Sequence, residues 1–150
     1  MIGIKFKIPN EYSNYLKQIL KEIDNNDYIW KIDEEEVYLD NGNDLFIEEI
    51  YTNAEFKKII EPSNYYTIFL NIQMYINNLG NLKIKNYKNF IKSSCILIIF
   101  ITDNEYVDIY CKDDKLLYKI KENAIINKFK DIKEITNIND IRKNFSAYTD

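Results

Sequence analysis

The sequence predicts an α+β fold in which helices pack on one face of a mostly antiparallel β-sheet. Apolar residues alternate with polar ones over 2–8 and 105–112, as in half-buried strands, and recur at helical spacing over 12–23 and 116–125. Strands and helices do not alternate strictly along the chain, which argues against a parallel sheet. Because 150 residues is a common length for one domain, we expect a single α+β domain spanning residues 1–150.

The segment 94–113 is predicted to be a β-hairpin at the centre of the sheet. Its first half is apolar on both faces, as in a strand with neighbours on both sides. Asp103 and Asn104 tolerate the positive φ of a two-residue hairpin turn. Such a turn pairs Thr102 with Glu105 and fixes every other pair, since a slip of one residue would move each side chain to the other face.

This register sets Ile98 opposite Ile109, with Ile96 and Phe100 on the same apolar face. The two long helical patterns, which have their own apolar stripes, are the elements expected to cover that face. Ile98 is therefore predicted to lie in the core beneath these helices.

The other face of the second hairpin strand carries Tyr106, Asp108 and Tyr110, two aromatic residues flanking a carboxylate. In a partner-binding hypothesis, the tyrosines supply contact area and Asp108 attracts a cation. The alternative is a strand face that is partly covered by a helix.

Local signals predict the remaining elements. Thr52 and Glu55 have the spacing of a capping box at the start of a helix that Pro62 prevents from continuing, and Asp113 or Asp114 caps the helix at 116–125. Further strands are expected at 28–32, 36–40, 45–47, 65–76 and 131–136, with a short helix near 87–91 and a last helix that begins at Asn139 or Asp140 and turns Ile141 and Phe145 inward.

The densest group of charges includes Glu34 and Glu35, in the turn predicted between the strands at 28–32 and 36–40, and Glu36, which begins the second of these strands. One hypothesis makes this group a binding surface for a basic partner, or a weak Ca²⁺ site. The alternative is a solvated turn, and the spacing of a calcium-binding loop is absent.

Histidine is absent from the chain, which excludes Ser-His and Cys-His nucleophile pairs, His-ligated zinc and histidine general bases. Three separate glycines form no glycine-rich phosphate loop. In the predicted register Cys95 and Cys111 point to opposite faces, so we expect free, buried thiols. We therefore predict no catalytic residues, no metal and no cofactor, although carboxylates are plentiful and no pair of them stands out.

Charge is distributed unevenly, which bears on the kind of partner. Residues 1–60 hold 7 lysines and 13 acidic residues, whereas residues 61–150 hold 13 basic and 11 acidic ones. The acidic half argues against a nucleic-acid partner and favours a basic protein. No apolar run is long enough for a membrane span and the N-terminus lacks a signal pattern, so we expect a cytoplasmic protein without a membrane partner.

Five parts of the chain carry a family resemblance: 8–12, 28–30, 65–69, 107–113 and 135–142, the last through Ile135-Thr136 and Asn139-Asp140-Ile141-Arg142. Together they resemble a family of small uncharacterised proteins from low-GC Gram-positive bacteria, described as a domain of unknown function. The resemblance covers nearly the whole chain and implies a bacterial source and one domain. It implies no activity and no site residues.

Two functional hypotheses remain. The first is a non-catalytic protein-binding module, such as a bacterial immunity or inhibitor protein that occludes its partner and is steered to it by negative charge. The second is a small-molecule-binding protein or minor enzyme, with Tyr and Asp lining a pocket between sheet and helices. A structural accessory subunit is not separable from the first, and the sequence does not indicate an oligomeric state.

Overall fold

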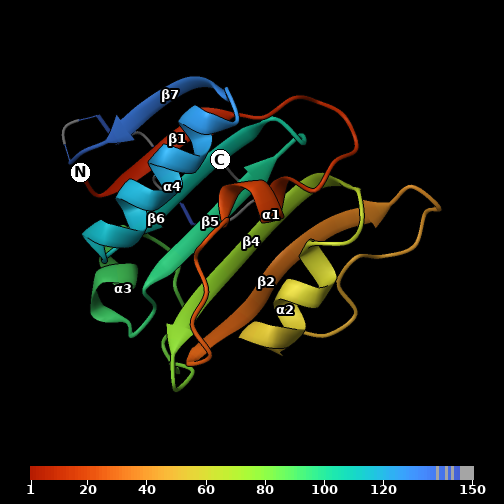
Figure 1. The fold of residues 1–150 in the computed structure, drawn as a ribbon. Helices are drawn as coiled ribbons and strands as arrows, with labels where there is room; N and C mark the ends of the chain where they lie inside the picture. Colours follow the sequence, from red (N-terminus) through yellow and green to blue (C-terminus); the bar gives the residue numbers. More distant parts are fainter. Residues whose placement is uncertain (138, 141, 143, 146–150) are drawn as a thin grey trace.

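The computed structural model describes residues 1–137, 139–140, 142 and 144–145. Across these residues it contains one sheet of seven strands in the order β3-β2-β4-β5-β6-β1-β7, in which every neighbouring pair is antiparallel. The strands are β1 (Gly3–Lys7), β2 (Tyr28–Leu39), β3 (Ile50–Thr52), β4 (Tyr65–Ile76), β5 (Leu97–Thr102), β6 (Tyr106–Cys111) and β7 (Lys130–Ile135). The first strand therefore lies between two strands from the last third of the chain (Figure 1).

Helices α1 (Tyr15–Ile19), α2 (Asn53–Ile60) and α4 (Asp114–Ile126) lie over one face of this sheet (Figure 1). The predicted α+β class, with an antiparallel sheet and helices packed on one face, is confirmed. The short helix α3 (Tyr87–Lys92) departs from it, because its Phe90 packs in the cluster on the opposite face. No helix in the described part of the chain is both long and apolar enough to cross a membrane.

Side-chain caps begin α2 and α4 where the sequence predicts them. The Thr52 hydroxyl accepts a hydrogen bond from the backbone N–H of Glu55, whose carboxylate accepts one from the N–H of Thr52 at 2.8 Å. The Asp113 carboxylate accepts bonds from the N–H groups of Lys115 and Leu116. These bonds satisfy backbone donors that the first turn of a helix leaves without an intrahelical partner.

Helix α1 is much shorter than the helix predicted at 12–23. Ser13 pairs with Tyr65 in an isolated antiparallel bridge, so this part of the chain extends the sheet and leaves Tyr12 exposed. Glu22 has a φ of 66°, which ends any continuation of the helix. The rest of the predicted apolar stripe, from Tyr15 to Ile23, is buried as expected.

A single twelve-residue strand, β2, replaces the two strands and turn predicted between Tyr28 and Asp40. It pairs with β4 along its whole length, with irregularities between Ile32 and Glu34 and between Glu36 and Val37. The charges that suggested a turn are accommodated by these bulges, which add residues to one strand without ending the ladder. The strand predicted at 45–47 is likewise wrong, and the neighbouring strand is β3.

The β5–β6 hairpin forms where predicted, but its register is shifted by one residue. Asp103 and Asn104 have positive φ values of 55° and 48°, and the N–H of Glu105 donates to the carbonyl oxygen of Thr102 at 3.1 Å. The ladder nevertheless resumes one residue later, with Thr102 opposite Tyr106. The loop therefore has three residues, and each predicted pair is displaced by one.

The sheet separates two hydrophobic clusters, and the displaced register decides which residues enter each. Leu97, Ile99 and Ile101 belong to the larger cluster beneath α1, α2 and α4. Ile98 is fully buried as predicted, but it lies opposite Tyr110 and belongs to the smaller cluster on the other face. The prediction that α1 and α4 cover Ile98 is therefore wrong.

Both cysteines are free and buried, and they lie in different clusters. Cys95 packs in the smaller cluster and Cys111 in the larger one, so the predicted placement on opposite faces is confirmed. Burial raises the pKa of each thiol to about 12.

We predict that Ile99→Ala lowers the free energy of unfolding by roughly 2–5 kcal/mol, because it leaves a cavity beneath the helices. Ile47, which is 82% exposed, provides a matched control, and Ile47→Ala should change the free energy by less than about 0.5 kcal/mol. Urea unfolding measures both. Equal losses would show that Ile99 does not occupy the larger core.

The two thiols should be nearly inert in the native protein. A pKa of about 12, raised from 9.0 by burial, lowers the thiolate fraction at neutral pH roughly a thousandfold. We expect iodoacetamide to label both cysteines in urea and neither in buffer, as measured by mass spectrometry over time. Rapid labelling in buffer of one cysteine would place that thiol at the surface.

Candidate functional site

The three residues of the predicted Tyr106–Asp108–Tyr110 surface share one face of β6 but differ in exposure. Tyr106 is 46% exposed, but the Tyr110 side chain is fully buried. Its hydroxyl donates to the Asp140 carboxylate at 2.5 Å, and burial is the largest cause of a raised pKa of the Tyr110 phenol. The expectation of a solvent-facing strand face is therefore wrong for Tyr110.

Asp108 belongs to an ion pair that sequence reasoning missed. The Nε of Arg142 donates to its carboxylate at 3.0 Å, and the side chains of Arg142 and Asp108 are only 3% and 18% exposed. The guanidinium also lies 4.2 Å from the centre of the Phe100 ring. The Asp108 carboxylate therefore holds the buried guanidinium of Arg142. Phe145, which lies close to Arg142 in the chain, packs in the smaller hydrophobic cluster. The predicted last helix includes Ile141, which lies outside the described residues.

Glu34, Glu35 and Glu36 lie within β2 and not on a turn. The Glu35 carboxylate accepts a hydrogen bond from the N–H of Val37 at 3.1 Å, and that of Glu36 accepts one from the Tyr38 hydroxyl at 2.9 Å. Strands β4 and β5 separate these glutamates from β6, so the structure does not bring the two predicted groups together. Their role in partner binding stays a prediction.

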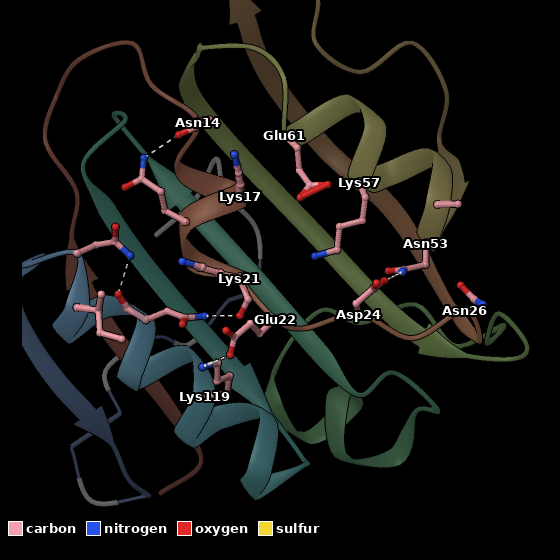
Figure 2. A pocket seen from close by; sticks show the side chains of 15 residues that line it. Asn14, Lys17, Lys21, Glu22, Asp24, Asn26, Asn53, Lys57, Glu61 and Lys119 are labelled. Carbon is pink, nitrogen blue, oxygen red and sulfur yellow. Dashed lines mark hydrogen bonds and ion pairs between the residues drawn. The ribbon is translucent and has the colours of Figure 1, made fainter.

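A cleft of about 650 Å³ lies between α1, α2 and α4 (Figure 2). Its lining is mostly charged or carries amide groups. The charged residues are Lys17, Lys21, Lys57, Lys119, Glu22, Asp24 and Glu61. The amide-bearing ones are Asn14, Gln18, Asn26, Asn53, Asn123 and Asn127, and Ala54 and Ile126 complete the lining. None of them was a predicted site residue.

Two buried asparagines, Asn53 and Asn123, fix the walls of this cleft. Asn53 accepts a hydrogen bond from the Trp30 indole N–H at 3.1 Å and donates to the Asp24 carboxylate. The side-chain amide of Asn123 donates to the carbonyl oxygens of Ile19 and Lys21, each at 2.9 Å. Asn53 therefore ties α2, and Asn123 ties α4, to residues 19–24 at and beyond the end of α1. These bonds hold the cleft in a defined shape.

Asn123 carried the one sequence signal that could have indicated this region. It follows Ile120 and precedes Ala124 in the apolar stripe of α4, and all three are buried. A buried amide must find hydrogen-bond partners, so its position in the stripe predicts a polar contact with a neighbouring element. The sequence does not say which element supplies those partners.

The cleft lysines have different surroundings. Lys119 pairs with Glu22 at 2.7 Å and with Glu122 at 3.6 Å. Lys57 leans from α2 towards α1 and donates to the Leu20 carbonyl oxygen at 3.3 Å (Figure 2). Burial lowers the pKa of the Lys57 ammonium, and the nearby carboxylates of Glu61 and Asp24 oppose that shift. The arrangement favours binding of anions and hydroxyl groups.

Metal binding has little support in the described part of the chain, which holds no group of three or more acidic or cysteine side chains arranged to ligate an ion. The cleft has three carboxylates: Glu22 pairs with Lys119, Asp24 accepts a hydrogen bond from Asn53, and both Asp24 and Glu61 act on Lys57.

Comparison with known proteins identifies the family. A model described as "Protein of unknown function (DUF2691)" matches residues 1–146. The chain belongs to this family. It is 34% identical over 150 residues to the "Uncharacterized protein YncE" of Bacillus subtilis (strain 168), covering 97% of this chain and 98% of that protein. The predicted resemblance to a low-GC Gram-positive family is thus confirmed. No solved structure matches this DUF2691 chain.

We predict that Asp108→Ala destabilises the protein by about 3 kcal/mol, because it leaves the Arg142 guanidinium buried without its carboxylate. Glu134, whose side chain is 42% exposed and pairs with Lys121 at 2.7 Å, is the matched control. Glu134→Ala should cost far less, because water screens an exposed ion pair. Urea unfolding compares the two, and similar small losses would place Asp108 and Arg142 in solvent.

Proposed function

We propose that this DUF2691 protein binds a small organic molecule in the cleft between α1, α2 and α4, without a catalytic step. The observation that carries the proposal is the cleft itself. Its volume of about 650 Å³ is in the range of ligand pockets, roughly 300–1,000 Å³. Its walls are held by buried hydrogen bonds from Asn53 and Asn123, which supports a pocket formed before the ligand arrives.

Residue chemistry supports binding in preference to catalysis. The chain has no histidine, and the thiols of Cys95 and Cys111 are buried in hydrophobic clusters and do not line the cleft. The cleft offers ammonium groups, carboxylates and amides, which are suited to hold a polar ligand. This proposal is a form of the second functional hypothesis, in which the cleft contains Asp24 but has Lys and Asn in place of the expected Tyr.

The first hypothesis, a protein-binding module of the immunity or inhibitor type, is a second candidate. It is supported by the part of β2 that carries Glu34, Glu35 and Glu36. Strand β3 pairs with β2 at residues 29–31, and residues 43–49 hydrogen-bond to the same edge at Ile32, Val37 and Leu39. The glutamates therefore lie between two paired stretches of that edge, and the support for this candidate is their negative charge, which favours a basic partner.

Ligand binding in the cleft can be tested by thermal unfolding with single compounds from a panel of sugars, amino acids, carboxylic acids and phosphate esters. A compound that binds the native state stabilises it by about 2.7 kcal/mol at a hundred times its Kd, which raises Tm by several degrees. Ala54→Trp places a large ring in the cleft, and we expect it to abolish the rise in Tm.

Lys88→Trp is the control, because Lys88 is exposed on α3, away from the cleft lining. It should keep the ligand-dependent rise. The proposal fails if no compound in the panel raises the Tm of the unaltered protein, or if the rise survives Ala54→Trp.

A further inference from the structure

The cleft has an excess of positive charge that its own carboxylates do not neutralise. Four lysines and three carboxylates line it, in a chain of net charge −4. Lys119 and Lys57 each have nearby carboxylates. The ammonium groups of Lys17 and Lys21 form no ion pair in the described part of the chain. Lys21 does act on Glu22, whose carboxyl pKa is lowered mainly by Lys119 and to a smaller extent by Lys21.

Lys17 lies in α1 and Lys21 lies just beyond its end, and both side chains line the cleft. Lys57 faces them from α2, with its ammonium 3.3 Å from the Leu20 carbonyl oxygen (Figure 2). A ligand in the cleft would meet positive charge from two helices. Because Lys57 is partly buried, a hydrogen bond from its ammonium to an anion is less weakened by water than one at the surface.

The amides that line the cleft indicate the rest of the ligand. The side-chain N–H group of Asn127 donates to the Asn123 carbonyl oxygen, and that of Gln18 donates to Asn14 and Ser13. These bonds orient Gln18 and Asn127 and leave their side-chain oxygens as acceptors. No aromatic ring lines the described cleft, so it offers no surface on which a base or other flat ring would stack.

We infer that the ligand is a small polyhydroxylated anion, with the charged group of a sugar phosphate or a sugar acid held by Lys17, Lys21 and Lys57. The amides hydrogen-bond its hydroxyl groups. This inference rests on the proposed function and names the chemical class that the cleft selects. Phosphate and carboxylate share the required chemistry, since both accept charge-assisted hydrogen bonds from ammonium groups.

Calorimetric titration with ribose 5-phosphate, gluconate and ribose tests this selection. We expect at least one of the two anions to bind and uncharged ribose to bind at least about tenfold more weakly, because it forms no charge-assisted bonds. Affinity for the anion should fall as salt rises. The stronger anion identifies whether the head group is a phosphate or a carboxylate.

The double variant Lys17→Gln/Lys21→Gln should weaken anion binding about tenfold or more, with an unchanged circular dichroism spectrum, since both side chains are exposed. Lys130→Gln/Lys133→Gln removes the same charge from exposed positions on β7 and should bind as the unaltered protein does. This pair separates local contacts from the effect of net charge.

The inference is overturned if neither anion binds, or if both double variants weaken binding equally. If uncharged compounds raise Tm in a manner blocked by Ala54→Trp while both anions fail, the cleft is a ligand site and only its assigned chemistry is wrong. If Ala54→Trp blocks nothing, the proposed function itself fails.

Discussion

Every side chain from Leu97 to Ile101 is fully buried, and alternate ones enter separate hydrophobic clusters on the two faces of β5. A strand in this position requires cover on both sides, because burying one face leaves the other in water. Helices α1, α2 and α4 cover one face, whereas α3 and Phe145 help to cover the other. The three helices that bury the larger cluster also provide the walls of the cleft. The candidate site is therefore a consequence of how the central strand is buried.

Local sequence signals predicted many elements of this fold, but they did not predict the hairpin register, which depends on whether one residue belongs to the loop or to the strand. The capping box at Thr52, the helix cap at Asp113 and the whole of β4 follow from short-range chemistry. The hairpin register does not, because β5 is apolar on both faces and either register buries it. Only the second strand distinguishes the two registers, and its Tyr110 is equally acceptable in a core or on a surface. Pattern alone therefore could not show that Glu105 belongs to the loop.

The candidate site was less predictable than the fold, because its parts come from three distant segments. Lys17, Lys57 and Asn123 are each ordinary helix residues, and only the packing of α1, α2 and α4 brings them to one cleft. The same difficulty concealed Arg142, which lies 34 residues from its partner Asp108. Sequence reasoning found clusters of charge that are contiguous in the chain, such as Glu34–Glu36, where the structure places local hydrogen bonds. Long-range pairing of single polar residues carries no such periodic signal.

The position of β1 constrains the order in which the native state can be completed. Gly3 pairs with Tyr110 on one side and with Ile135 on the other, so β1 has no neighbour in the sheet until β6 or β7 has formed. The β2–β4 and β5–β6 pairs join segments that are close in the chain and can form early, whereas β1 requires contacts across more than a hundred residues. A folding order that began with β1 would leave Ile4 and Phe6 uncovered, because both of its partner strands lie far along the chain. This topology therefore favours docking of β1 after the β5–β6 hairpin has formed.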